Sequence, residues 1–301
     1  MEQSVAKRTD ASPSGASTTT LSSSSTRRPP VHKLLLRDRR ATAGLIILVI
    51  IVVGTIFAPL ISPYDPQSQQ YDFLSAPSMT HILGTDDLNR DLFTRILYGG
   101  RISLFVGIVT VSISLVAGVL MGLLAGYYGG WIDNIIMRYI DLQWAFPNFI
   151  IAVYLVAIFG TGLLNVIVAV SLAFLDDFAR LTRGMVLTLR EDEFVLAAKS
   201  VGASDAHIML RHILPNALAP LIVQATISVS FAILAEATLS FLGLGVKSST
   251  PTWGLIISDA RSFFSRAWWL GIYPGMAIML TVLSINFLGD ALRDILDVRN
   301  D

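Results

Sequence analysis

The sequence has no cysteine, and charged residues occupy only 15% of its 301 positions. Without cysteine the chain can form no disulfide and offers no thiolate nucleophile. The motifs HExxH and GxSxG are also absent, so the sequence supports neither a zinc hydrolase nor a serine hydrolase. Lys plus Arg and Asp plus Glu both number 22, and no basic stripe with interleaved aromatic residues indicates nucleic-acid binding. We therefore expect no catalytic residue, no cofactor, no metal site and no nucleic-acid partner.

Apolar residues dominate what is present. The chain is 53% hydrophobic with a mean hydropathy of +0.63, which is too apolar for an ordinary soluble domain. Long apolar runs alternate with short polar segments. This pattern predicts an all-α membrane protein with about six transmembrane helices.

The first apolar run covers residues 41–61 and follows a cluster of basic residues. About 21 residues can cross a hydrocarbon core of roughly 30 Å, whereas the core of a secretory signal has about 7–15 residues. We expect an uncleaved transmembrane helix at 37–62. The Ser-, Thr- and Pro-rich segment at 1–36 predicts a disordered tail, and the basic cluster places it in the cytoplasm.

After this helix we expect an extracytoplasmic loop at 63–100, a core of five transmembrane helices at 101–297 and a short tail at 298–301. The apolar runs of the core are 101–126, 135–160, 163–178, 218–242 and 270–288.

Small residues and a proline mark two of these runs. Gly118, Gly122 and Gly126 recur every four residues, which predicts close packing of two helix backbones in lipid. Pro147 predicts a kink in the run at 135–160.

Charged residues inside or beside the runs are expected to pair locally. Arg138 and Asp141 are three residues apart and can share a helix face. Asp176 and Asp177 end the run at 163–178, and a local ion pair with Arg180 is favoured over a contact with a solute.

Glu236 is the one charge in the run at 218–242. Intramembrane carboxylates usually face a bundle interior or a water-filled path, so Glu236 is a candidate for the translocation path. Its place near the outer end of the run, where water can reach, keeps a structural role equally open.

Residues 83–100 read LGTDDLNRDLFTRILYGG. The acids do not follow the EF-hand order, and no closing Glu is present, so a calcium site is not favoured. We expect Thr85 or Asp86 to cap a helix that starts at Asp87.

Residues 191–220 form a charged island between two apolar blocks. We predict a short helix at 193–201, a break at Gly202, and a second helix that Ser204 caps and Pro215 ends. The second helix has one apolar stripe, made of Ala206, Met209, Leu210, Ile213 and Leu214. Such a hairpin can lie on the membrane surface or dock on another protein.

The hairpin resembles the EAA loop by which ABC importer permeases dock on their ATPases. The residues that carry this resemblance are Ala197, Ala198, Gly202, Leu214 and Pro215. Two positions depart from the family pattern, with Leu196 in place of Glu and His212 in place of Ile.

Two further stretches resemble the same family. Residues 83–100 are similar to the LGTD…GRD…SR signature of peptide-permease C-type subunits, with Asn89 in place of Gly. Residues 289–297, GDALRDILD, resemble the carboxy-terminal GDxLRDxLD. From Arg37 to Asp297 the chain thus resembles the C-type permease subunit of a dipeptide or oligopeptide ABC importer.

The resemblance implies the type I permease fold of ABC importers, with a cytoplasmic coupling-helix hairpin and alternating access. It implies as partners a second homologous permease subunit, two cytosolic ATPase subunits, an extracytoplasmic peptide-binding protein and membrane lipid. The location would be the bacterial inner membrane, and the excess of Lys and Arg in predicted cytoplasmic segments places both termini in the cytoplasm. The implied contacts with the ATPase are Ala197, Ala198, Gly202, Ala203, Ser204, Asp205, Ala206, Met209, Leu214 and Pro215.

Other functions stay open on the sequence. Similar subunits carry nickel, glutathione and other small solutes, and an ATP-independent channel or receptor would not need the hairpin. The glycine-rich residues 241–249 end in Lys-Ser, but their spacing does not match GxxxxGK[ST], so we expect no ATP site and no enzyme activity.

Overall fold

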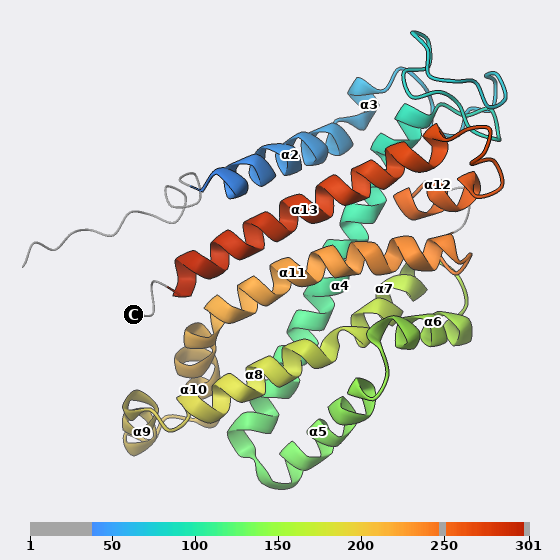
Figure 1. The fold of residues 1–301 in the computed structure, drawn as a ribbon. Coiled ribbons are helices and arrows are strands. Elements are labelled where there is room, and N and C mark those ends of the chain that lie inside the picture. Colours follow the sequence, from blue (N-terminus) through green and yellow to red (C-terminus); the bar gives the residue numbers. More distant parts are fainter. Residues whose placement is uncertain (1–37, 247–250, 298–301) are drawn as a thin grey trace, which may run out of the picture.

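The structure is a computed structural model that describes residues 38–246 and 251–297 (Figure 1). The tails expected at 1–36 and 298–301 lie outside the described residues, as do positions 247–250 of the glycine-rich segment. Within the described ranges the regular secondary structure is helical, apart from one isolated bridge. The prediction of an all-α protein is confirmed.

The described chain forms a bundle of helices (Figure 1). In chain order they are α2 (Arg39–Ile56), α3 (Ala58–Ile61), α4 (Leu92–Tyr128), α5 (Gly130–Trp144), α6 (Asn148–Phe159), α7 (Leu163–Ala173), α8 (Leu175–Leu189), α9 (Glu193–Ser200), α10 (Asp205–Ile208), a π-helical turn (Met209–Ile213), α11 (Leu214–Phe241), α12 (Trp253–Ala260) and α13 (Trp269–Asp297). Helix α2 packs on α13, α13 packs on α11, and α4 crosses α11 and α8 (Figure 1). Helices α9 and α10 mark one end of the bundle, here called the hairpin end. The loop before α4 and helix α12 mark the opposite, loop end (Figure 1).

Four helical segments in the described part of the chain are long and apolar enough to cross a membrane. They are α2, α4, the continuous segment Asp205–Phe241 and α13. A fifth crossing results if α5 and α6 count as one span, although these helices are bent by 94°. The kink predicted at Pro147 is therefore confirmed, and it divides the span expected at 135–160 into two helices. The break lies at Pro147, which has no backbone N–H to continue the helix.

The span expected at 163–178 is also interrupted. Helix α7 has only 11 residues, and the chain breaks at Phe174 before α8 continues to Leu189. Alone, α7 is too short to cross a hydrocarbon core of roughly 30 Å. Broken spans thus explain why fewer continuous crossings are found than the sequence predicts.

Helices α4 and α8 approach each other through the three predicted glycines. A Cβ atom at Gly122 would lie 2.5 Å from the carbonyl oxygen of Ala179, and one at Gly118 would lie 2.6 Å from Cβ of Phe178. A Cβ at Gly126 would meet Val186 at 2.8 Å. Any larger side chain would push the helices apart, so the prediction of close packing is confirmed.

Helix α4 starts later than the sequence predicts, at Leu92, and its cap is neither Thr85 nor Asp86. The Asp91 side chain accepts a hydrogen bond from the backbone N–H of Thr94 at 2.8 Å. Asp86 instead accepts from the backbone N–H of Arg90 at 2.8 Å, which closes a turn before the helix. The helix thus begins inside the expected loop at 63–100.

Candidate functional site

The first half of the hairpin at 191–220 has the predicted structure. Helix α9 covers Glu193–Ser200, and Gly202 has a φ of +80°, a conformation that glycine adopts without strain. The Ser204 side chain accepts a hydrogen bond from the backbone N–H of His207, as expected for an N-cap. These three predictions are confirmed.

The second half differs, because Pro215 does not end the helix. The backbone N–H of Leu214 donates to the carbonyl oxygen of Met209, five residues earlier, which makes a π-helical turn. Pro215 then falls in the first turn of α11, directly after the π-turn, and does not stop the helix. The chain therefore runs as one helical segment from Asp205 to Phe241.

The π-turn also divides the expected apolar stripe. Met209 and Ile213 are buried in the main hydrophobic core, whereas Leu210 is 55% exposed and Ala206 is exposed. An inserted π-turn rotates the residues that precede it relative to those that follow, so one stripe cannot stay on one face. The expectation of a single continuous stripe is wrong.

The predicted contact residues fall into two groups. The exposed residues are Ala197, Gly202, Ser204, Asp205, Ala206 and Pro215, and Ala203 and Leu214 are half-buried. The buried ones, Ala198 and Met209, belong to the core that holds the hairpin on the bundle. The exposed group is available to another molecule.

The sequence analysis missed the most exposed apolar side chain of the hairpin. Val201 is 84% exposed and directly precedes Gly202, and Leu196 is 51% exposed. A β-branched residue beside a helix-ending glycine was the available signal. Exposed apolar side chains around a sharp turn are suited to a groove on a partner.

Contacts with the end of α4 hold the hairpin in place. The Tyr127 hydroxyl donates to the Asp205 carboxylate at 2.8 Å, and the Lys199 ammonium lies 5.1 Å from the Tyr127 ring centroid. The Arg190 guanidinium donates to the carbonyl oxygen of Gly126 at 2.9 Å. Movement of the hairpin therefore acts on α4 as well as on α8 and α11.

Glu236 lies at the contact of α4, α11 and α12, and its side chain is fully buried. Its carboxylate accepts hydrogen bonds from Ser103 at 3.2 Å and Ser240 at 2.8 Å. Ser103 also accepts from the backbone N–H of Trp253 in the first turn of α12 at 3.2 Å. The expected access of water does not occur in this structure, so the burial favours a structural role. A role in the translocation path stays a prediction.

The other charges on the membrane helices do not pair locally. Arg180 donates to Asp141 of α5 at 3.0 Å, and its guanidinium stacks over Trp144 at 4.2 Å from the ring centroid. The predicted pair of Arg138 with Asp141 is therefore wrong, and Arg180 makes no hydrogen bond with the neighbouring aspartates. The packing of α5 on α8 brings Asp141 near Arg180, which sequence spacing alone does not show.

Charged residues at the loop end tie the segment before α4 to α12. The Asp86 carboxylate accepts from the guanidinium of Arg90 at 2.7 Å and also from that of Arg95. Both arginines lie within 3.5 Å of Asp259 on α12. Burial raises the pKa of the neighbouring Asp87 carboxyl, and the negative charge of Asp86 adds to the increase. Asp86 and Asp259 are the partners of the two arginines, which gives the 83–100 motif a structural role.

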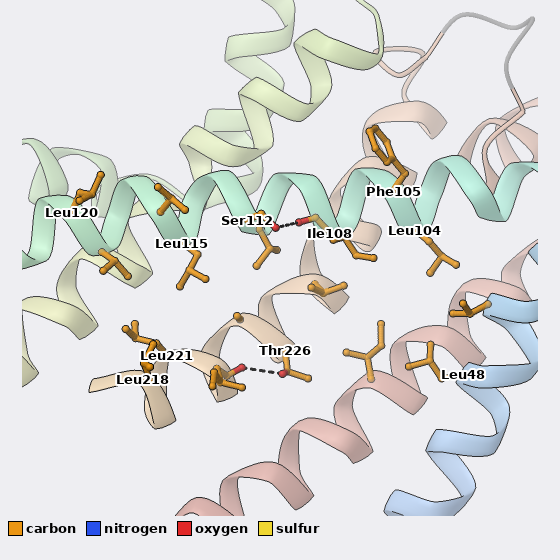
Figure 2. Close-up of a pocket in the computed structure, with 18 of the residues that line it drawn as sticks. Leu48, Leu104, Phe105, Ile108, Ser112, Leu115, Leu120, Leu218, Leu221 and Thr226 are labelled. Atoms are coloured by element: carbon orange, nitrogen blue, oxygen red, sulfur yellow. Dashed lines mark hydrogen bonds between the residues drawn. The ribbon is translucent and has the colours of Figure 1, made fainter. Parts of the chain in front are cut away.

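An apolar cavity with a volume of about 840 Å³ lies between α2, α4, α11 and α13 (Figure 2). Its walls are mainly Leu, Ile, Val and Phe side chains, including Leu48, Phe105 and Leu221. The hydroxyls of Ser112 and Thr226 in this wall donate to carbonyl oxygens of their own helices (Figure 2). The cavity therefore suits apolar groups and offers little to orient a polar solute.

These features define a helical membrane protein with an exposed hairpin that continues into a membrane-length helix. The family model for the binding-protein-dependent transport system inner membrane component matches residues 118–301. The model for the N-terminal TM domain of oligopeptide transport permease C matches residues 31–77. The chain belongs to the family of binding-protein-dependent transport system inner membrane components.

Curated relatives span most of the chain. It is 47% identical over 243 residues, 80% of each chain, to the dipeptide transport system permease protein DppC of Alkalihalophilus pseudofirmus. It is 46% identical over 249 residues, 80% of this chain and 82% of the relative, to the di/tripeptide permease DppC of Pseudomonas aeruginosa. The glutathione permease GsiD of Escherichia coli O157:H7 is 45% identical over 248 residues, 82% of each chain.

A solved structure shares the fold. One chain of the MetNI methionine ABC transporter, in inward-facing conformations, matches with a TM-score of 0.54 and 20% identity. The match covers 67% of this chain and 96% of that chain. The prediction of an ABC importer permease fold is confirmed, and the protein is a membrane transport subunit and not itself an enzyme.

Proposed function

We propose that this protein is the permease subunit of an ABC importer that moves dipeptides or oligopeptides across the bacterial inner membrane. The relatives named for dipeptide and di/tripeptide transport support this cargo. The relatives named for glutathione also fit, because glutathione is itself a short peptide with free ammonium and carboxylate groups. Dipeptides, tripeptides and glutathione are all short zwitterionic peptides.

The observation that carries the proposal is the continuity of the hairpin with α11. The exposed hairpin residues precede a helical segment that runs unbroken from Asp205 to Phe241. A displacement of the hairpin would pass along this segment, which includes the π-turn and Pro220. When two separate ATPase subunits close on ATP, they would push the hairpin and tilt α8 and α11, which would open the solute path alternately to each side.

The partners follow from the same assignment. A second, homologous permease subunit would complete the path, and an extracytoplasmic binding protein would deliver the peptide. The hairpin end would face the cytoplasm and the loop end the outside, which agrees with the basic residues at 190, 199 and 211 in the hairpin region. The chain itself would hydrolyse no ATP.

The test is uptake by the complete transporter in proteoliposomes. Labelled dipeptide should accumulate only when ATP, both ATPase subunits and the binding protein are present, and unlabelled di- and tripeptides should compete. Nickel should not compete. Uptake that continues without ATPase subunits would instead show a channel and would contradict the proposal.

A further inference from the structure

Helix α8 has one face packed on α4 and one face open. The packed face lies against Gly118, Gly122 and Gly126 of α4, as described above. The open face surrounds a hollow of about 520 Å³, lined by Asp177, Arg180, Leu181, Gly184, Met185 and Thr188. The cavity of Figure 2 has no carboxylate in its lining, whereas this hollow has both the carboxylate of Asp177 and the guanidinium of Arg180.

Gly184 has no packing role within the described chain. A Cβ atom there would meet nothing within 4 Å, whereas the three glycines of α4 each face a close neighbour. Glycine weakens a helix interior, and no contact or positive φ here requires it. The missing side chain at Gly184 leaves the open face of α8 shallow at this position.

The charge pair lies in the first turns of α8, directly after a break between two helices. Helix α7 ends at Ala173 and α8 begins at Leu175, so Asp177 and Arg180 follow the interruption at Phe174. Charged residues on membrane helices are costly and usually mark pathways, and the solute sites of transporters are typically formed by interrupted helices.

Neighbouring residues hold the Arg180 guanidinium in place, but no hydrogen bond joins it to the Asp177 carboxylate. One Arg180 nitrogen donates to Asp141, Trp144 supports the guanidinium plane, and the buried Nε has no hydrogen-bond partner in the described chain. The Asp177 carboxylate accepts no hydrogen bond from the described residues and lies in the field of Arg180. Asp176, on the same turn, is fully buried and makes no side-chain hydrogen bond there either.

The hollow continues towards the hairpin end. Leu181 lines both this hollow and a second one of about 310 Å³, which also includes Pro220 and Gln224 of α11 and Arg293 of α13. A partly polar surface thus extends from α8 to α11 and α13.

We propose that the open face of α8 is a wall of the solute path, and that Asp177 and Arg180 receive the α-ammonium and α-carboxylate of a passing short peptide. The path and the peptide rest on the proposed function. The pair has the charge pattern of a zwitterion, and the absence of a side chain at Gly184 leaves room beside it. A helix of the second permease packed against this face is the competing occupant, and the tests below separate the two.

The first test uses the natural absence of cysteine. In the complete transporter, Gly184→Cys and Thr188→Cys should react with charged, water-soluble methanethiosulfonates at least 10-fold faster than Leu120→Cys in the apolar cavity. Modification should block ATP-dependent uptake, and Asp177→Asn should lower the preference of Cys at position 184 for the cationic reagent several-fold. Slow labelling of both cysteines, or labelling that leaves uptake unchanged, would overturn the proposal in favour of a subunit contact.

The second test measures peptide uptake. Asp177→Asn and Arg180→Gln should each lower dipeptide uptake by about tenfold without changing complex assembly or the affinity of the isolated binding protein. Arg138→Gln, on α5 and outside the hollow, is the matched control and should retain uptake. If the wild-type transporter imports peptide and both variants import it equally well, this inference is wrong, but the proposed function stands. If the wild type imports no peptide, the proposed function fails, and the labelling test still decides whether α8 lines a path.

Discussion

The backbone N–H of Leu214 donates to the carbonyl oxygen of Met209, five residues earlier, where the hairpin joins α11. This π-turn adds one residue to a helical turn and sets the rotation of the hairpin relative to the membrane helix. The exposed position of Leu210 and the burial of Met209 both depend on it.

Deletion of the exposed residue Arg211 should therefore restore a regular α-helix. The hairpin would rotate by about 100° and shift by about 1.5 Å relative to α11. We expect the chain to insert in the membrane in normal amount but to lose ATPase co-purification and uptake. Arg211→Ala is the control, because it keeps the number of residues, and it should behave like wild type. A fully active deletion variant would show that the rotation of the hairpin is unimportant.

Gly202→Asp tests the turn between the two hairpin helices. The φ of +80° strains a residue with a Cβ, but no atom lies within 4 Å of the new Cβ, so the folding cost should be about 1 kcal/mol. Membrane insertion should stay normal, while ATPase co-purification and uptake should fall strongly. Gly202→Asn tolerates positive φ better and carries no charge, so it should show a smaller loss. If both variants kept full activity, the hairpin would be a surface loop without a docking role.

Gly122→Leu tests the contact of α4 with α8. The new Cβ would lie 2.5 Å from the Ala179 carbonyl oxygen, so the helices must separate, at a cost of about 1–3 kcal/mol or more. We expect a lower thermal unfolding temperature and less folded protein. Gly275→Ala is the matched control, since nothing lies within 4 Å of its Cβ, and it should leave stability equal or slightly higher. Similar stability of both variants would contradict the close packing.

Glu236 variants separate a structural role from a path role. Glu236→Ala removes the acceptor of two buried serine hydroxyls and leaves a void, so stability should fall by about 2–4 kcal/mol. Glu236→Gln keeps the shape and an acceptor oxygen. It should retain uptake with a thermal unfolding temperature near that of wild type. Normal stability with loss of uptake in Glu236→Gln would favour the path role instead.

Local patterns predicted much of this fold, and distant contacts explain most errors. The apolar runs and the glycine spacing of Gly118, Gly122 and Gly126 predicted membrane helices and their close contact, because both depend on periodicity within one helix. The ion pair of Arg180 with Asp141 was not predictable from local spacing, because it joins α8 to α5 across a contact between two helices.

In the hairpin, too, local features were predicted correctly, whereas features that depend on packing were not. Gly202 and Ser204 act through their own backbone and were placed correctly. The sequence predicts a helix end at Pro215, because a proline at a helix end and one in a first turn look alike in sequence. The π-turn before it has no sequence signal of its own, and the packing of Met209 and Ile213 in the core accompanies it.

Cross-linking from Val201 tests the central claim, that the hairpin docks on an ATPase, most directly. Because the chain has no cysteine, Val201→Cys gives a single site for a short photoactivatable thiol reagent. In the assembled transporter we predict a cross-link to an ATPase subunit, and none from Ser68→Cys in the loop before α4. A cross-link to lipid or to no protein from Val201→Cys, in a complex that still imports its solute, would contradict the account.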